Sequence, residues 1–384
     1  MQEVYIVGAG ATAVAEHWER TLGSLAAEAL GAALGPIARE RIGAVYVANA
    51  LGGALHVQAQ VGALVAEACG LGGAEASSVD AAGASGGVAL RQAYLAVASG
   101  AHDLVAVVGA EKVTDVLDAR LEAGLALAGD ADWEGIHGAT LTAQWALLMR
   151  RYMHTYGYDA GDFAPFPVNA HANGAANPKA LYRFPINGDK VRGAGMVADP
   201  LGMLDCSTTA DGAAALLLAG PGLARELGGT QIRIAGSAVA TDTLALHSRA
   251  NPLWLNAAAR SSAAALRGAG LTQRDIQVLE LTDPHGIAAT LALEANGFAE
   301  AGAGVQLARE GAITPAGATP LATGGGCKAR GDTAGANGVY QVAELVRQLR
   351  GEAGKAQVNG ARVALAQCLG GIGATAATHI LVAD

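Results

Sequence analysis

The chain has 384 residues, of which 52% are hydrophobic and only 15% charged, so a mainly disordered protein is excluded. Its 25 basic and 34 acidic side chains give a formal net charge of −9, and no stripe of lysine and arginine runs among aromatic residues. Binding to nucleic acid is therefore not expected. Glycine fills 54 positions and aromatic residues only 4%, which predicts small aliphatic side chains packed in close layers.

The apolar segments and the cysteines predict a cytoplasmic protein without a metal site. The longest apolar runs, 213–219 and 287–293, are far shorter than the ~20 residues of a membrane span. The N-terminal segment lacks the basic stretch of a signal peptide. The four cysteines are scattered without a Cys-x-x-Cys pair, which argues against both a disulfide framework and a zinc site.

Strands and helices alternate through the first part of the chain. The pattern predicts strands at 4–7, 45–48 and 104–108, helices at 22–34, 58–69 and 88–99, and a glycine turn at 83–87. The strand at 104–108 is apolar at every position, as expected in a sheet covered on both faces. This alternation predicts an α/β fold with a mostly parallel sheet.

The second half repeats this order. It predicts strands at 232–235, 278–281 and 363–366, helices at 261–268, 287–296 and 339–349, and a glycine turn at 331–335. Such a match predicts an internal duplication, with halves at 1–229 and 230–384. Two stacked halves would bring equivalent helix N-termini together, where free N–H groups carry a partial positive charge.

An irregular insert at about 112–200 lies within the first half, between its repeated core and the second half. It is richer in asparagine, proline, histidine and aromatic residues, and it carries Lys179, Arg183, Lys190 and Arg192 within a short span. Two interpretations remain open: a solvated surface lobe, or a lid whose basic side chains bind an anionic ligand.

The glycines after the first strand do not predict a nicotinamide cofactor. Gly8 to Ala13 fit the Gly-x-Gly-x-x-Ala pattern, but a dinucleotide site also needs an acidic residue at the end of the second strand. That strand ends at Asn49, and the second half has no such pattern. No bound cofactor is expected.

Several different short motifs are spread along nearly the whole chain, at 80–87, 110–115, 150–154, 173–178, 204–207, 211–214 and 328–338. Together they resemble the thiolase superfamily, in particular its sterol-carrier-protein-type and archaeal-type branch. The resemblance implies a five-layered α-β-α-β-α duplication with an inserted loop domain. It also implies a coenzyme A thioester as substrate, a homodimer, and a small partner subunit with an oligonucleotide-fold domain and a zinc ribbon.

Three of the four catalytic positions that the resemblance implies are altered. The family's nucleophilic cysteine falls on Gly83, its oxyanion-binding asparagine or histidine on Thr282, and its activating histidine on Asp332. Glycine keeps the N–H groups of a helix N-terminus but has nothing to acylate. Only Cys368 and Gly370 match the family's Cys-x-Gly, in which the cysteine carries a proton and the glycine N–H helps to hold an oxyanion.

Each candidate residue also has a structural explanation. Asp332 is either the N-cap of a helix or a general base, and Cys368 either a small buried apolar residue or a proton carrier. His285 and Asp283 follow a strand that ends at the same cleft, so either could replace a lost group. Ser85 is expected to cap the helix after the glycine turn, and Cys327 to pack in the core.

Three functions follow from this pattern. The first is cleavage or formation of a carbon–carbon bond beta to a thioester by retro-aldol chemistry, as in thiolase-like retro-aldolases that lack the family cysteine. Asp332 or His285 would be the base, the Gly83 and Gly370 N–H groups would hold the oxyanion, and Cys368 could protonate the enolate. The second is a non-catalytic acyl-CoA-binding subunit. The third is an acyltransferase with a displaced nucleophile, Cys368 or Cys327.

Overall fold

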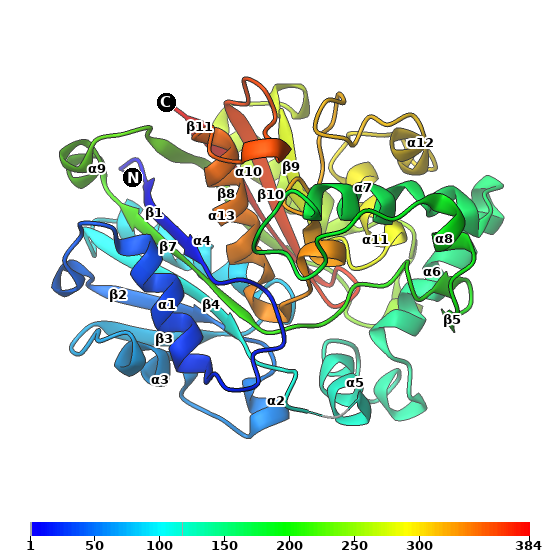
Figure 1. The fold of residues 1–384 in the computed structure, drawn as a ribbon, viewed down its shortest axis with the longest axis horizontal. Helices are drawn as coiled ribbons and strands as arrows, with labels where there is room; N and C mark the ends of the chain where they lie inside the picture. Colours follow the sequence, from blue (N-terminus) through cyan, green and yellow to red (C-terminus); the bar gives the residue numbers. More distant parts are fainter. Residues whose placement is uncertain (1, 117) are drawn as a thin grey trace.

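The computed structural model describes residues 2–116 and 118–384, and nine strands of this part form one continuous sheet (Figure 1). Their order across the sheet is β3-β2-β4-β7-β1-β8-β11-β10-β9. The strands are β1 (Tyr5–Ala11), β2 (Ala44–Ala48), β3 (Glu75–Val79), β4 (Leu104–Glu111), β7 (Gly212–Ala219), β8 (Ile232–Thr241), β9 (Val278–Leu281), β10 (Val363–Gly370) and β11 (Thr375–Ala383). A separate hairpin consists of β5 (Met196–Ala198) and β6 (Leu201–Gly202).

The strand order contains the duplication that the sequence predicts. The run β2-β4-β7-β1 in the first half returns as β9-β10-β11-β8 in the second. In each run the first pair is parallel and the next two pairs are antiparallel. The boundary between 229 and 230 itself stays a prediction.

The expectation of a mostly parallel sheet is wrong. Only the pairs β2/β3, β2/β4 and β9/β10 are parallel, and the other five neighbouring pairs are antiparallel. The difference comes from β7 and β11, two strands that the sequence interpretation did not assign. Because β11 follows β10 after only residues 371–374, no helical crossover is possible and the pair must be antiparallel.

Helices cover both outer faces and fill the space between the two half-sheets. The central layer is α4 (Ser85–Ala98) and α13 (Asn337–Leu349), which contact strands of both halves. The outer layers are α1 (Leu22–Leu34) with α3 (Val61–Ala68), and α10 (Asn256–Ala269) with α11 (Gly286–Ala295). This arrangement confirms the predicted five-layered α/β class. The half-sheets meet at one edge, where β1 pairs with β8.

Glycine permits the central helices to approach closely. A Cβ added at Gly338 would lie 2.6 Å from the backbone nitrogen of Gly87, and one added at Gly86 would lie 2.7 Å from that of Val339. Only residues without a side chain allow this crossing, which explains part of the high glycine content.

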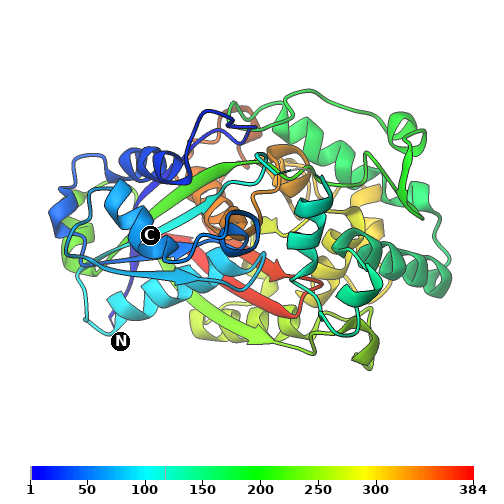
Figure 2. The same cartoon turned by 90° about the horizontal axis from the view of Figure 1, so that it is seen from below.

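Most of the insert packs onto the second half, whereas Leu121 and Leu125 pack with Leu55 of the first half, and the insert is not a solvated lobe. Its helices are α5 (Asp118–Ala126), α6 (Leu141–Tyr156), α7 (Pro165–Gly174) and α8 (Gly188–Arg192). Figures 1 and 2 both place α6, α7 and α8 at the end of the molecule that holds α11 and α12 (Gly304–Arg309). Trp145, Met149 and Phe163 of the insert are buried in the same core as α11. The solvated interpretation fails because these large apolar side chains face inward.

The remaining helices are short. They are α2 (Gly52–His56), α9 (Pro221–Leu227) and a π-helical turn at Gly326–Arg330. Within 2–116 and 118–384, no helix combines the length and the apolar character that crossing a bilayer requires.

Candidate functional site

Two equivalent turns open the central helices and meet at the carboxyl edge of the sheet. Before α4, Asp80 Oδ1 accepts a hydrogen bond from the Ala82 N–H at 2.9 Å; before α13, Asp332 Oδ1 accepts one from the Ala334 N–H at 3.0 Å. Ala82 and Ala334 both have a positive φ, of 50° and 43°. Asp332 is therefore the counterpart of Asp80 in a duplicated turn.

Asp332 has further partners in this turn. Its carboxylate also accepts hydrogen bonds from Asn337 Nδ2 at 2.6 Å and from Ser207 Oγ at 3.1 Å. The expectation that Asp332 is the N-cap of α13 is wrong, because the N-cap is Ala336 and no side chain caps that helix. The hydrogen bonds of Asp332 instead hold the turn that precedes the helix, which is a structural role. Its role as a general base stays a prediction.

The structure brings Gly83 and Gly370 together. A Cβ added at Gly83 would lie 2.5 Å from the carbonyl oxygen of Leu369, and one added at Gly370 would lie 2.4 Å from that of Ala81. Neither position can take a side chain unless the backbone moves. Their part in holding an oxyanion stays a prediction.

Both buried cysteines near the site are poor nucleophiles. Cys368 Sγ lies between the central helices and donates a long hydrogen bond, 3.5 Å, to the Ala84 carbonyl. Burial raises the pKa of the Cys368 thiol to about 12 and that of Cys327 well above its ordinary value. Both thiols are therefore protonated at neutral pH.

Thr282 and Asp283 tie the glycine-rich loops to the end of β9. Thr282 Oγ1 accepts a hydrogen bond from the Leu369 N–H at 3.0 Å, and Asp283 Oδ1 accepts one from the Cys327 N–H at 2.6 Å. Burial raises the pKa of Asp283 to about 7, with a smaller contribution from the charge of Asp332. The expectation that Ser85 caps α4 is wrong: the N-cap is Ala84, and Ser85 Oγ instead donates to the Ala82 carbonyl in the turn before the helix.

His285 faces a small cavity between the end of β9, α7 and the π-helical turn. Asp205, Asp283 and Lys328 line the same cavity. His285 Nδ1 is buried and has no hydrogen-bond partner in the described part of the chain. Burial lowers the pKa of His285 to about 4, so the ring is neutral at neutral pH.

Lys328 and Asp205 are the residues that sequence reasoning missed. Lys328 is 4% exposed, and burial lowers its pKa to about 8. Burial also raises the pKa of Asp205. A group such as Lys328, whose pKa lies near neutrality, can exchange protons with a bound molecule at little cost. The available signal was a lysine within the glycine-rich and alanine-rich run 322–336, which predicts burial.

The four basic residues of the insert do not share one location. Lys179 Nζ donates to the carbonyl of Ala11 beside β1, whereas Arg192 packs on Gly161 and pairs with Asp189. Arg183 and Lys190 are exposed. Proximity in sequence therefore does not place them in a single patch, and their binding of an anion stays a prediction.

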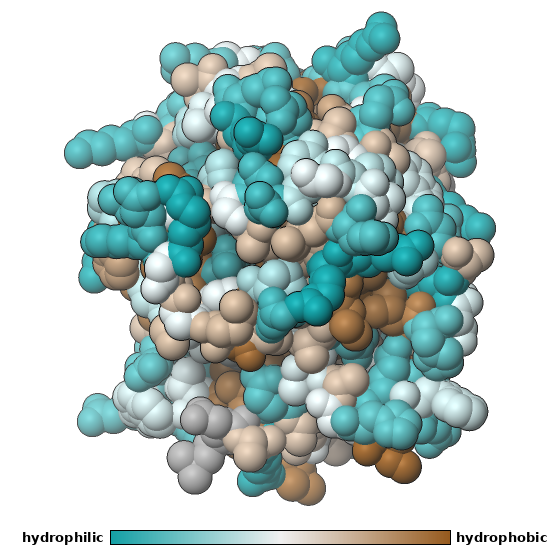
Figure 3. Space-filling view, turned by 90° about the vertical axis from the view of Figure 1, so that its right-hand side faces the viewer, coloured by the Kyte–Doolittle hydropathy of each residue, from teal (hydrophilic) through white to brown (hydrophobic). Residues whose placement is uncertain are grey.

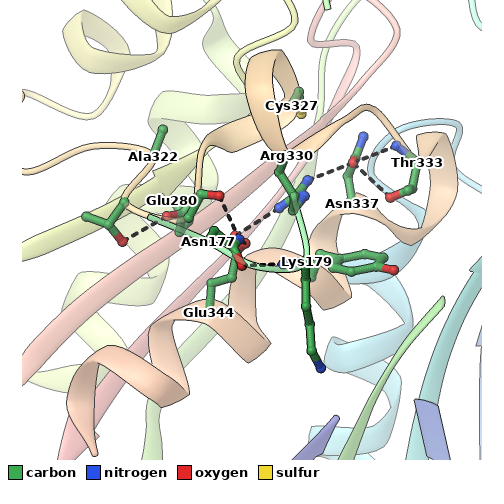
Figure 4. Close-up of polar contacts among 12 residues, drawn as sticks. Asn177, Lys179, Glu280, Ala322, Cys327, Arg330, Thr333, Asn337 and Glu344 are labelled. Carbon is green, nitrogen blue, oxygen red and sulfur yellow. Dashed lines mark hydrogen bonds and ion pairs between the residues drawn. The ribbon is translucent and has the colours of Figure 1, made fainter. Parts of the chain in front are cut away.

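A buried ion pair joins the π-helical turn to α13 (Figure 4). Arg330 is 1% exposed; its guanidinium lies 3.0 Å from Glu344 Oε2 and donates to Asn337 Oδ1 at 2.9 Å. Asn177 Nδ2 also donates to Glu344. This network anchors the turn that carries Lys328 to α13. In the described part of the chain, no group of three or more His, Cys, Asp or Glu residues could hold a metal ion.

Two family models match the two halves of this duplicated fold. A family model of the thiolase N-terminal domain matches residues 4–221, and a model described as thiolase C-terminal domain-like matches residues 238–383. The chain belongs to the thiolase family.

Similar proteins match from about three quarters of the chain to its whole length. An acetyl-CoA acetyltransferase of Methanothermobacter thermautotrophicus is 39% identical, with 99% of each chain covered. The benzoylsuccinyl-CoA thiolase subunit BbsB of Thauera aromatica is 31% identical over 77% of this chain and 76% of its own. Among solved structures, an Ltp2-ChsH2(DUF35) aldolase superposes with a TM-score of 0.87 at 25% identity, covering 100% of this chain and 98% of that chain.

Proposed function

We propose that this protein binds acyl-CoA thioesters and breaks or forms a carbon–carbon bond beta to the thioester without an acyl-cysteine intermediate. One observation carries the proposal: the nucleophile position is Gly83, whose missing side chain would run into the Leu369 carbonyl 2.5 Å away. Cys368 and Cys327, the two candidates for a displaced nucleophile, are buried and protonated, so neither replaces the missing thiolate.

Retro-aldol cleavage suits a site of this kind. A base removes the proton of the β-hydroxyl, and donors stabilise the enolate that forms on the thioester. Gly83 lies against the carbonyl of Leu369, the residue before Gly370, and the N–H groups of the two glycines are the proposed donors. His285 lines the cavity and its buried Nδ1 has no partner among the described residues, so it is a better candidate for contact with substrate than Asp332, whose carboxylate already accepts three hydrogen bonds.

The comparisons support this proposal from two sides. The structurally similar protein is named an aldolase, and it is solved together with a partner, ChsH2. The relatives in Methanothermobacter and Thauera are named for CoA thioesters as substrates. We therefore propose a CoA thioester as substrate, with no bound cofactor.

The test is incubation with a panel of β-hydroxyacyl-CoA and β-ketoacyl-CoA thioesters. Mass spectrometry then measures the products. Release of an aldehyde or ketone together with a shortened acyl-CoA is expected. Thiolysis that depends on free coenzyme A would contradict the proposal and favour acyl transfer.

A non-catalytic acyl-CoA-binding subunit is the second candidate. The Thauera relative is named as one subunit of its thiolase, which favours this role. Tight binding of acyl-CoA in titration calorimetry without any turnover would support it. The same titration with Lys179→Ala and Arg192→Ala tests whether these side chains bind the coenzyme.

We also propose that the protein assembles with a second copy of itself and with a small partner subunit. Strand β3 lies at the edge of the sheet, and its residues Glu75 to Ser78 are exposed. An open edge of this kind suits pairing with another chain. On the face that carries α6, α8 and β5, Met196, Val197 and Met203 are also exposed, and apolar side chains lie among polar ones there (Figure 3).

A further inference from the structure

The cavity beside His285 gathers ionisable side chains from three separate segments. Asp205 follows β6, Asp283 and His285 follow β9, and Lys328 comes from the π-helical turn. All four are buried. The remaining lining is mainly apolar and includes Phe166 and Pro167 of α7. The cavity is therefore a buried, mainly apolar site with four ionisable side chains in its lining.

Lys328 is only partly satisfied at this cavity. Its Nζ donates to the Cys206 carbonyl at 2.7 Å and lies 5.7 Å from the centre of the Tyr182 ring. An ammonium group has three N–H donors, and within the described residues only this one acceptor is within hydrogen-bond distance. At least one donor is thus available to a molecule in the cavity.

Lys328 also forms no ion pair with a carboxylate of the described chain, unlike the nearby Arg330. Arg330, two residues further on, pairs with Glu344 at 3.0 Å, whereas no carboxylate of the described chain lies within 4.0 Å of Lys328 Nζ. An unpaired ammonium in the interior is costly, so the neutral amine is favoured. Burial has the largest effect on Lys328 and lowers its pKa to about 8. The nearby acidic groups raise this pKa by a smaller amount; they are Cys206, Asp205 and Asp283. His171 and His285 also face it, and both have lowered pKa values.

We propose that Lys328 carries the proton in the carbon–carbon bond reaction, taking it from the β-hydroxyl of the substrate and returning it to the α-carbon. The inference rests on the proposed function and names a catalytic residue for it. His285 Nδ1, buried and without a partner, is the hydrogen-bonding group that orients the same hydroxyl.

The step balances without any further reactant. The neutral amine accepts the hydroxyl proton, the oxygen electrons form the carbonyl on the β-carbon, and the bond between the α- and β-carbons breaks. Its electron pair moves to the α-carbon and is delocalised onto the thioester oxygen. The Lys328 ammonium then protonates the α-carbon. The products are a ketone or aldehyde and a shortened acyl-CoA, and the amine is neutral again.

The return step can be measured by itself, because its reverse is removal of an α-proton from a simple thioester. Propionyl-CoA in heavy water should exchange its α-hydrogens, followed by NMR. Lys328→Met should lower the exchange rate by ~10²–10⁴-fold, the usual contribution of a general acid–base group. Lys355→Met, at an exposed lysine outside the site, should leave it unchanged.

Chemical rescue separates a proton carrier from a structural lysine. Ethylamine added to Lys328→Ala should restore exchange in proportion to the concentration of neutral amine, which a structural role would not do. The wild-type exchange rate should rise between about pH 7 and pH 9 as the amine loses its proton. A rate that stays flat over this range would overturn the inference even if both variants fail to fold.

The outcomes separate the inference from the proposed function. Cleavage of a β-hydroxyacyl-CoA that is undiminished in Lys328→Met overturns the role of Lys328 and leaves the proposed function standing. Exchange that requires Lys328, in a protein that cleaves no β-hydroxyacyl-CoA, supports the proton carrier and contradicts the retro-aldol reaction.

Discussion

A cysteine at position 83 has no room for its side chain. In Gly83→Cys the Cβ would meet the Leu369 carbonyl at 2.5 Å, and relieving this contact should cost about 1–3 kcal/mol of stability. The variant should also lack thiolase activity, because Asp332 is held in three hydrogen bonds and cannot act as the missing histidine.

Thermal unfolding and thiolysis of acetoacetyl-CoA measure these two effects. Gly53→Cys is the matched control, since a Cβ at Gly53 has nothing within 4 Å. Ordinary thiolase turnover in Gly83→Cys would show that the altered positions are not one catalytic unit.

Burial of the neutral His285 ring predicts a loss of stability in acid. Its pKa is about 4 in the folded protein, against 6.5 ordinarily, so between these values the unfolded chain binds more protons than the folded one. The free energy of unfolding therefore falls as the pH drops through this window. His285→Gln removes the effect and should show a shallower decline in urea unfolding, whereas His137→Gln, at an exposed site, should follow the wild type. Parallel curves for wild type and His285→Gln would be incompatible with a buried neutral ring.

At the scale of elements, the crossing of α4 and α13 depends on glycine. Gly338→Ala would place a Cβ 2.6 Å from the Gly87 nitrogen and 3.0 Å from Cys368 Sγ, which should cost about 1–3 kcal/mol. Gly31→Ala in α1 has open space and should instead stabilise by about 0.5–1 kcal/mol, because alanine is the better helix former. Chemical denaturation of the two variants gives the comparison, and equal effects would mean that the helices do not approach this closely.

Some helices, strands and turns could be predicted from the sequence, and others could not. The turns before α4 and α13 were predictable because their glycines recur at matching places, and so was the duplication. Strands β7 and β11 were not assigned, because a run that is buried at nearly every position has no periodicity to separate strand from helix. The cavity was only half predictable. His285 and Asp283 follow a recognisable strand, and the composition of 322–336 indicates that Lys328 is buried, but nothing local indicates that Lys328 lies beside them.

At the scale of the whole molecule, the two halves should not fold independently. The central helices α4 and α13 each bury residues against both half-sheets, and β1 pairs with β8 across the halves. The intact chain should therefore unfold in urea in one cooperative transition. The separate segments 1–229 and 230–384 should bind a hydrophobic dye and lack a cooperative melt. Two resolved transitions in the intact chain would show that the halves are autonomous.

The central claim is that carbon–carbon chemistry here proceeds without an acyl-enzyme, and the mass of the intact protein tests it most directly. The protein is mixed with a β-ketoacyl-CoA or acetyl-CoA, quenched in acid during turnover, and its mass measured. Since Gly83 has no thiol and burial keeps Cys368 and Cys327 protonated, the mass should stay that of the unmodified chain. A species heavier by one acyl group, located on either cysteine, would contradict the account.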